Sequence, residues 1–251
     1  MRDILLATIH CGNKTFNDIW AVIFDKDGTL ASSESFLRNL AYRRSRLIDA
    51  QIPGVQDPLL MAFGADNDQF NPSGLMAVGT RLDNEIAAAA YVAETGRDWI
   101  ESLEIVRSAF AEADKYLPRK ATETPPLEGA VELLQVLTQT GLKVGILSSD
   151  STQNVQEFVQ CYDLVSSVHC QLGSDGYSSK SDPALLEQLF VSLGAIPENT
   201  LMVGDSQLDV QIAQTSGMAG CIAVTGGWTK TVRVSGADAI VHHLNEIQVV
   251  E

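Results

Sequence analysis

The spacing of hydrophobic residues along the chain changes twice, near residues 30 and 120. At the start, the apolar run ILLATIH and the shorter KTF flank CGN, a tripeptide typical of a turn. The sequence therefore predicts a small hairpin over residues 4–16. The run IWAVIFD follows, and its β-branched and aromatic residues predict a strand that is buried on both faces.

Residues 33–117 have the spacing of helices. Between Trp99 and Leu117, apolar residues recur at steps of three and four, which predicts an amphipathic helix with Asp98 as its N-cap. The segment LDNEIAAAAYVAETG predicts a second helix that ends before Gly96, and SESFLRNLAYRRSRLIDA predicts a third. The polar segment FGADNDQFNPSG between them is expected to be a loop.

Short apolar runs alternate with helical segments in the last part of the chain. Helices are expected at 129–140, 151–160, 183–193 and 207–216. Strands are expected at KVGIL, TLMVG, GCIAV and DAIV, with DAIV as the last strand. This alternation predicts an α/β fold, a doubly wound parallel sheet with helices on both faces, whose first strand is separated from the rest by a helical insertion.

Composition and charge limit the possible partners. The chain has 251 residues, of which 45% are hydrophobic, enough for one large domain or for a domain with an insertion. With 17 basic and 32 acidic residues, its formal net charge is -15. Such a surface repels nucleic acids and anionic membranes, so neither is expected as a partner. It also repels phosphorylated metabolites, so a site for one requires a metal ion or a local group of basic residues.

The lack of a recognisable targeting signal and the pattern of the cysteines predict the location of the protein. No apolar stretch is long enough to cross a bilayer, and the segment MRDILLATIHCGNKTF does not fit the plan of a signal peptide. No metal-binding spacing relates the four cysteines, which are expected to be buried or half-buried thiols in a reducing compartment: Cys11, Cys161, Cys170 and Cys221. The sequence thus predicts a cytoplasmic protein.

Acidic and small hydroxyl residues stand where three of the predicted strands end. Because the carboxyl ends of parallel strands meet at one edge of a sheet, where α/β proteins bind ligands, we expect these residues to lie together. They are Asp25, Lys26, Asp27 and Gly28 after AVIF; Ser148, Ser149 and Asp150 after VGIL; Gly204, Asp205, Ser206 and Asp209 after LMV; and Lys180 in the loop GYSSKSDP.

Each of these residues has a simpler interpretation when it is taken alone. Asp205 can be a helix N-cap, Ser148 a turn residue and Lys180 a solvated surface charge. Their order at successive strand ends favours a common site instead. For Asp150 and Asp209, a capping or solvated role fits as well as a role in the site.

The order of these residues resembles the haloacid dehalogenase (HAD) superfamily, chiefly its phosphatases. DKDGTL is similar to the first motif of the superfamily, ILSS to the second, Lys180 to the third and VGDSQLD to the fourth. The resemblance implies a Rossmann-like HAD core domain formed by residues 1–30 and 120–251. It also implies an inserted α-helical cap domain at residues 31–119, as in phosphoglycolate phosphatase-like and β-phosphoglucomutase-like members.

The resemblance implies hydrolysis of a small phosphate monoester through an aspartyl-phosphate. Asp25 is the implied nucleophile, and Asp27 would protonate the leaving oxygen and later take a proton from water. The implied cofactor is Mg²⁺, held by the side chains of Asp25 and Asp205 and by the backbone carbonyl of Asp27. A small phosphorylated metabolite is the implied partner.

Further residues have supporting roles in the same resemblance. Ser148 and backbone N–H groups near Ser149 would bind phosphoryl oxygens, and Lys180 would neutralise both the phosphate and Asp25. Gly204 and Asp209 would support the metal site from outside the direct ligands.

Three positions depart from the family pattern. Ser149 stands where the second motif usually has Asn, and Ser181 stands where a proline often follows the lysine. Lys26 lies between the two aspartates, where many of the phosphatases have an apolar residue. The sequence leaves two roles open for Lys26: contact with the leaving group, or a side chain that points to solvent.

Family resemblance does not fix the reaction. A dehalogenase needs neither Asp27 nor Asp205, and a phosphonate hydrolase needs a cap lysine, for which the insertion offers only Lys115, with Lys120 in the linker beyond it. A sugar-phosphate mutase keeps both aspartates and is the main alternative, separated by its need for a bisphosphate activator. A non-catalytic member that binds a phosphometabolite is the alternative outside enzymes.

Substrate choice falls to the cap in the capped members of the superfamily. Phosphoglycolate and small sugar phosphates are the usual substrates there, and the sequence does not choose between them. At most one or two of five arginines in the insertion are expected to face the site: Arg38, Arg43, Arg44, Arg46 and Arg81.

Overall fold

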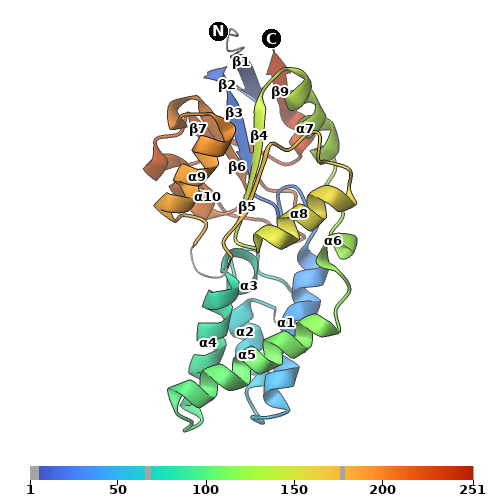
Figure 1. The fold of residues 1–251 in the computed structure, drawn as a ribbon, viewed down its shortest axis with the longest axis vertical. Helices are drawn as coiled ribbons and strands as arrows, with labels where there is room; N and C mark the ends of the chain where they lie inside the picture. The colour runs from blue at the N-terminus through green and yellow to red at the C-terminus, as the bar shows by residue number, and fades with distance from the viewer. Residues whose placement is uncertain (1–5, 66–68, 176–178, 251) are drawn as a thin grey trace.

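A computed structural model describes residues 6–65, 69–175 and 179–250 of the chain. In it, a sheet covered by helices forms one end of an elongated molecule, and a group of helices forms the other (Figure 1). Positions 4 and 5 of the predicted hairpin, and short parts of the two predicted loops at 66–68 and 176–178, lie outside the described residues.

The main sheet has six parallel strands in the order β5-β4-β3-β6-β7-β8. Its first strand along the chain, β3, lies in the middle, and all four of its residues are buried. This confirms the prediction of a doubly wound parallel sheet. The bounds are β3 (Ala21–Phe24), β4 (Lys143–Ser148), β5 (Cys170–Gly173), β6 (Thr200–Gly204), β7 (Gly220–Val224) and β8 (Ala239–Val241).

Helices cover both faces of this sheet (Figure 1). Successive side chains of a strand point to opposite faces, so Val22 and Phe24 pack with α7 and α8, whereas Ala21 and Ile23 pack with α9 and α10. All four helices agree with the predicted segments: α7 (Ala130–Gln139), α8 (Thr152–Cys161), α9 (Pro183–Leu193) and α10 (Gln207–Ser216).

A second, three-stranded sheet lies beyond the main one, with the order β2-β1-β9. The predicted hairpin forms β1 (Ala7–Cys11) and β2 (Lys14–Ile19), and β9 (Ile247–Val250) adds to β1 in antiparallel register. The prediction that DAIV is the last strand is therefore wrong. The strand β9 was missed because IQVV is short and contains a polar residue, and because its partner lies at the other end of the chain.

The insertion between β3 and β4 forms a helical unit with its own hydrophobic cluster. Its helices are α1 (Glu34–Asp49), α2 (Gln56–Phe63), α3 (Leu75–Val78), α4 (Arg81–Glu94) and α5 (Trp99–Lys115). Asp98 caps α5 by accepting the N–H of Glu101, as predicted. The exact division of the chain into domains at residues 30 and 120 stays a prediction.

Trp228 and the return linker help to connect the helical unit to the sheet part. Trp228, in the loop after β7, joins the hydrophobic cluster of the helical unit and stacks on Phe70, with ring centroids 5.4 Å apart. The return linker carries the short helix α6 (Lys120–Glu123), which packs beside α8. These contacts matter because both Trp228 and Lys120 also reach the candidate site.

Two further observations concern expectations about the surface. Within residues 6–65, 69–175 and 179–250, no helix combines the length and apolar character needed to cross a membrane. Cys11, Cys170 and Cys221 are buried, but Cys161 is exposed at the end of α8, so the expectation of buried or half-buried thiols is wrong at that position.

Candidate active site

A tight turn after β3 brings the first motif into shape. The N–H groups of Leu30 and Ala31 donate to the carbonyl of Lys26, at 2.9 and 2.8 Å, and Gly28 has a φ of 82°. A Cβ at Gly28 would lie 2.2 Å from Nε1 of Trp228, so the turn requires glycine for its conformation and for space. The turn sends Asp25 and Asp27 into two different groups of charges.

The first group, called here the acidic cluster, consists of Asp25, Lys180, Asp205 and Asp209. Oxygen atoms of its three carboxylates lie within 4.8 Å of one another, and all three residues are buried. Lys180 Nζ lies 3.0 Å from Asp25 Oδ2 and 2.7 Å from Asp209 Oδ1. The third and fourth motifs therefore meet the first at the end of β3, as the sequence predicts.

Local hydrogen bonds fix the two carboxylates of the fourth motif. Asp205 accepts hydrogen bonds from Thr29 Oγ1 at 2.8 Å and from Trp228 Nε1 at 2.6 Å. Asp209 accepts from the N–H and Oγ of Ser206 as the partner in a capping box at the start of α10. Since Asp209 also accepts from Lys180, it serves as both a helix cap and a member of the cluster, and is not solvated.

Burial and excess negative charge raise the pKa values of the carboxyl groups Asp25 and Asp205 in this cluster. Burial raises the pKa of Asp25 to about 6, although Lys180 opposes the shift, and burial with the nearby Asp25 raises the pKa of Asp205 well above its ordinary value. Burial lowers the pKa of Lys180, but Asp209 and Asp25 outweigh it and raise the pKa. Three carboxylates face one ammonium, which leaves two formal negative charges uncompensated.

This donor set fits a divalent metal ion. Mg²⁺ prefers oxygen ligands, and its two charges equal the uncompensated charge of the acidic cluster. Each hydrogen-bonded oxygen of Asp205 keeps a further lone pair for a ligand bond. The side chains of Asp25 and Asp205 are therefore suitable ligands, with Asp209 close behind them.

The second group, called here the balanced cluster, consists of Lys26, Asp27, Lys120 and Asp150. Lys26 Nζ lies 2.5 Å from Asp27 Oδ1 and 3.2 Å from Asp150 Oδ2, and Lys120 Nζ lies 2.6 Å from Asp27 Oδ2 and 2.8 Å from Asp150 Oδ2. Lys26 is only 1% exposed, so the interpretation that it points to solvent is wrong. Two carboxylates here match two ammonium groups.

In the balanced cluster, the two lysines lower the pKa of the carboxyl groups, opposite to the direction found in the acidic cluster. Burial alone would raise the pKa of both carboxyls, but Lys120 and Lys26 outweigh it and hold the pKa of Asp27 and of Asp150 below the ordinary value. Ser33 adds a hydrogen bond from its Oγ to Asp27 Oδ1 at 2.5 Å. Asp27 is therefore ionised at neutral pH.

The second motif lies between the two clusters and the helical unit. Ser148 is buried, and its Oγ accepts the N–H of Asp150 at 3.2 Å. Ser149 Oγ donates to the carbonyl of Val78, at the end of α3, at 3.0 Å. The side chain of Ser149 thus contacts the helical unit, while its backbone N–H stays the predicted phosphate donor.

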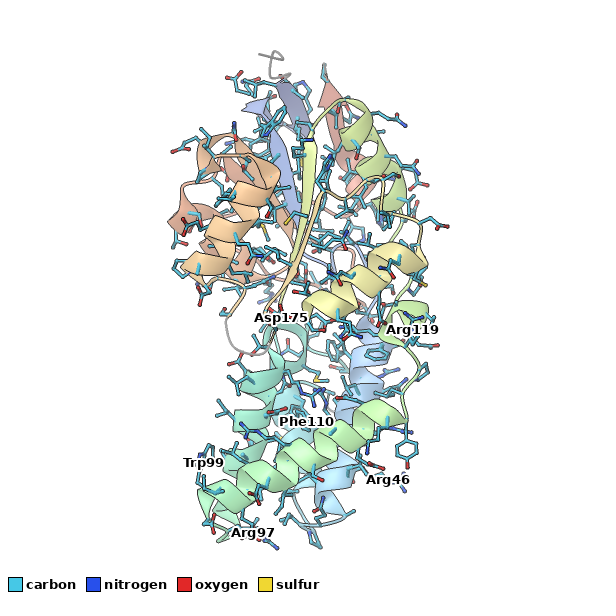
Figure 2. The ribbon with its side chains drawn as sticks, viewed as in Figure 1. Arg46, Arg97, Trp99, Phe110, Arg119 and Asp175 are labelled. Carbon is cyan, nitrogen blue, oxygen red and sulfur yellow. The ribbon has the colours of Figure 1, made fainter. Side chains whose placement is uncertain are left out.

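A cavity of about 540 Å³ opens beside the balanced cluster, between the sheet part and the helical unit. Asp27, Lys120 and Ser149 line it from the sheet side. Arg44 and Arg81 line it from the helical unit, whereas Arg43 and Arg46 do not. Arg119 and Asp175, which also line the cavity, lie near the junction of the two parts (Figure 2).

The sequence did not indicate two residues that complete the site. Lys120 was considered only as a linker lysine, yet it contacts Asp27 across 93 positions of sequence. Trp228 lies in a loop with no recognised motif, and only its fold-dependent position beside Asp205 gives it a part in the site. Neither residue has a local sequence signal that could have found it.

Comparison with known proteins agrees with this fold. Over residues 19–217 the chain matches the haloacid dehalogenase-like hydrolases, and it belongs to that family. The predicted superfamily is thereby confirmed, and with it the prediction of a hydrolase.

The individual relatives and solved structures share only a modest part of the sequence with this chain. The phosphoglycolate phosphatase of Rhodospirillum rubrum is 28% identical over 225 residues, which cover 88% of this chain and 86% of the relative. The phosphoglycolate phosphatase of Caulobacter vibrioides is 24% identical over 244 residues, which cover 96% of this chain and 92% of the relative. A crystal structure described as a predicted phosphoglycolate phosphatase from Haemophilus somnus 129pt has a TM-score of 0.62 at 18% identity, covering 90% of this chain and 95% of that one. The structural likeness supports the fold.

Proposed function

We propose that the protein is a Mg²⁺-dependent phosphatase that hydrolyses a small phosphate monoester through an aspartyl-phosphate on Asp25. The acidic cluster carries this proposal: three buried carboxylates at the end of β3 surround one lysine and lack two positive charges. Mg²⁺, when bound by Asp25, Asp205 and the backbone carbonyl of Asp27, would offset the negative charge of the phosphoryl group.

In the first step, a carboxylate oxygen of Asp25 attacks phosphorus, and the bond from phosphorus to the ester oxygen breaks. Lys180, which contacts Asp25, stabilises the phosphoryl charge, and Ser148 with the N–H of Ser149 binds its oxygens. In the second step, water attacks phosphorus, the bond to Asp25 breaks, and Asp27 accepts the proton of water. The ionised state of Asp27 in the balanced cluster suits this second step.

The first step requires a proton on the leaving oxygen, which Asp27 would supply. The low pKa of Asp27 leaves little of it protonated at neutral pH, so esters with acidic leaving groups, which need less protonation, should react faster. Phosphoglycolate is one of the first substrates to test, because curated relatives with full-length similarity carry that activity in their names. The proposal includes the cytoplasm as the location, which the sequence predicts.

The experiment is release of phosphate from an aryl phosphate by purified protein, with Mg²⁺ and with a chelator. Wild-type protein with Mg²⁺ should turn over, the chelator should abolish turnover, and Asp25→Asn should lower kcat by at least about 1000-fold. Asp98→Asn makes the same chemical change at a distant helix cap and should keep activity.

A covalent intermediate can be detected separately. Asp27→Asn, which cannot take the proton of water, should accumulate a phosphoryl group on the intact protein that hydroxylamine removes. Full activity in chelator, or near-normal turnover by Asp25→Asn, would refute the proposal. A strict requirement for a sugar bisphosphate would indicate a mutase instead.

A further inference from the structure

Arg44, on α1, is a buried cation that faces the cavity from the helical unit. It is 6% exposed, and its guanidinium carbon lies 4.1 Å from the centroid of the Phe110 ring. Phe110 belongs to α5 and lies in the interior of the helical unit (Figure 2). Stacking on the ring fixes the plane of the guanidinium, which is the arrangement that favours recognition of an anion by two parallel hydrogen bonds.

The partners of Arg44 leave its charge largely unmatched. Among the residues that the structure describes, its one ion pair is a long contact of 3.5 Å from Nη2 to Asp114 Oδ1, and its Nε has no hydrogen-bond partner. Asp114 makes its short contact of 2.5 Å with Arg81, which also binds Glu85 at 2.8 Å. Since Arg107 takes the other oxygen of Glu85, the long contact with Asp114 is the ion pair that remains for Arg44 among the described residues.

Burial of the largely unmatched charge of Arg44 destabilises the fold unless a ligand binds beside it. A buried guanidinium with one long contact loses hydration that the protein does not replace, and burial lowers the pKa of Arg44 to about 10, which still leaves it charged at neutral pH. A ligand that supplies the missing anion would offset this loss of hydration. The cavity is the space from which such a ligand would come.

Other basic groups of the cavity are already matched. Lys120 contacts two carboxylates, Arg81 contacts two, and Arg119 lies 3.3 Å from Glu157. Among the described cavity residues, Arg44 is therefore the cation best placed to take an anion from a ligand.

A second polar atom in the same cavity, Oδ1 of Asn84, has no hydrogen-bond partner in the part of the chain that the structure describes. Asn84 is 3% exposed, and its Nδ2 donates to the carbonyl of Thr80 at 2.8 Å. That bond orients the amide, because a carbonyl only accepts, and it leaves Oδ1 buried without a donor. Oδ1 is suited to a hydroxyl group and unsuited to a carboxylate.

The length of α1 sets the distance between Arg44 and the reacting end of the site. Ser33, whose hydroxyl contacts Asp27, lies at the start of α1, and the rise per residue puts Arg44 about 16 Å further along the helix axis. Helical side chains lean back toward the N-terminus, so the guanidinium comes within roughly 10 Å of Asp27. The distal anion of a ligand bound at both ends thus lies several carbons from its phosphate.

We propose that Arg44 binds a second anionic group on the leaving portion of the substrate, and that the substrate class is a phosphate monoester of a hydroxylated carboxylic acid with about four to six carbons. The proposal rests on the proposed phosphatase function. It separates this chain from a dedicated phosphoglycolate phosphatase, because glycolate is too short to reach Arg44 while its phosphate is at Asp25.

The test compares substrates that differ only in the distal group. The pair 6-phosphogluconate and sorbitol 6-phosphate has a carboxylate or a CH₂OH at the end of six carbons, and phosphoglycolate with 2-hydroxyethyl phosphate is the two-carbon pair. For wild-type protein, the ratio of kcat/KM within the six-carbon pair should favour the acid at least tenfold, and more than in the two-carbon pair. Arg44→Met should lower the six-carbon ratio roughly 10- to 100-fold, mainly through KM.

Arg43→Met is the matched control, because it removes the same charge from the same helix outside the cavity and should leave the ratio unchanged. Asp114→Asn provides a test of opposite sign: it removes the acid that competes for Arg44, so the ratio should rise about threefold or more. Should Arg44→Met fail to fold, Asp114→Asn decides alone.

The outcomes separate the two proposals. Turnover of an aryl phosphate with no preference within the six-carbon pair would overturn the role of Arg44 while the phosphatase function stands. An equal fall of the ratio in Arg43→Met, or no rise in Asp114→Asn, would also overturn it. Absence of turnover on every phosphate ester with Mg²⁺ would refute the phosphatase function itself.

Discussion

The two charge clusters that flank the Asp25–Asp27 turn are alike in burial and opposite in electrostatics. In the acidic cluster, three carboxylates surround one lysine, and the pKa of Asp25 and of Asp205 is raised. In the balanced cluster, two lysines match two carboxylates, and the pKa of Asp27 and of Asp150 is lowered. Burial by itself favours the neutral acid in both places, so the number of nearby lysines decides the sign.

The difference between the clusters matches the two roles that we propose for Asp25 and Asp27. In the proposed mechanism, the carboxylate of the uncompensated cluster binds a metal ion and is the nucleophile. A carboxylate between two lysines keeps its charge without metal and is available to accept a proton from water. Lys26, the residue between them, directs this division, because its side chain joins the balanced cluster.

The largest expected effect on stability comes from breaking the balanced cluster at Asp150. Asp150→Asn removes one of the two carboxylates that Lys26 and Lys120 share, so two buried ammonium groups are left with the single negative charge of Asp27. We expect a loss of about 3 kcal/mol in the free energy of unfolding at pH 7, measured by urea denaturation. Asp98→Asn, at an N-cap where Asn substitutes well, should change it by less than about 0.5 kcal/mol.

The pH dependence of this loss follows from the lowered pKa of Asp150. Its stabilising contribution is present above the ordinary pKa of 3.8 and is lost as the pH falls through the lower pKa of the folded state. The difference between wild-type protein and Asp150→Asn should therefore persist from pH 7 to pH 5. A difference that disappears within this range would contradict the assignment of charges.

Exchange of an aspartate for asparagine in the acidic cluster should increase the free energy of unfolding, in contrast to the same exchange at Asp150. The pKa of Asp25 in the folded metal-free protein is about 6, above the ordinary 3.8, so its ionisation destabilises the fold as the pH rises through 6. Asp25→Asn should then stabilise the metal-free protein at pH 7 by up to about 3 kcal/mol and by close to nothing at pH 4. Destabilisation at pH 7 without metal would show that the cluster is not short of positive charge.

Much of the fold could be predicted because its signals are local. The helices α9 and α10 and the strand β7 follow from apolar runs that end at Gly194 and Gly217, where each helix closes in a left-handed conformation. The strands β5 and β9 could not, because CQLG and IQVV are short and polar in part, and pairing with distant strands stabilises them.

The acidic cluster was predictable in the same way, since its three aspartates stand in motifs that follow strands and Lys180 matches the third motif. The sequence did not predict that Lys26, Asp27, Lys120 and Asp150 form the balanced cluster. The sequence left open whether Lys26 contacts the leaving group or points to solvent, because sequence alone does not reveal that Asp150 and the α6 linker lie against it. Lys120 and Trp228 come to the site from segments that only the tertiary fold brings there.

A smaller effect is expected from removal of one lysine of the balanced cluster. Lys120→Met should raise the pKa of Asp27, because Lys120 is the stronger of the two cations that lower it. With an aryl phosphate, whose leaving group is acidic, we expect breakdown of the proposed aspartyl-phosphate to limit the rate, and the acidic limb of the kcat profile should then move to higher pH by about one unit. The measurement is kcat between pH 4.5 and 8.5.

Lys115→Met is the matched control, since Lys115 is an exposed lysine that contacts Glu112 outside both clusters. Its profile should coincide with that of wild-type protein. If Lys120→Met lowers kcat by the same factor at every pH, Lys120 acts on the substrate and not through Asp27.

The smallest expected effect concerns Trp228, through which the acidic cluster contacts the helical unit. Its indole N–H donates to Asp205 at 2.6 Å, and its ring stacks on Phe70 at an interplanar angle of 21°. Trp228→Phe keeps an aromatic ring and removes the donor, so Asp205 is held less firmly as a metal ligand. The Mg²⁺ concentration for half-maximal activity should rise roughly threefold to tenfold. Phe70→Leu, which removes the stacking partner and keeps the N–H, should change it less. If instead Trp228→Phe alters KM and leaves the Mg²⁺ dependence unchanged, the indole serves the junction with the helical unit alone, and the acidic cluster is independent of that unit.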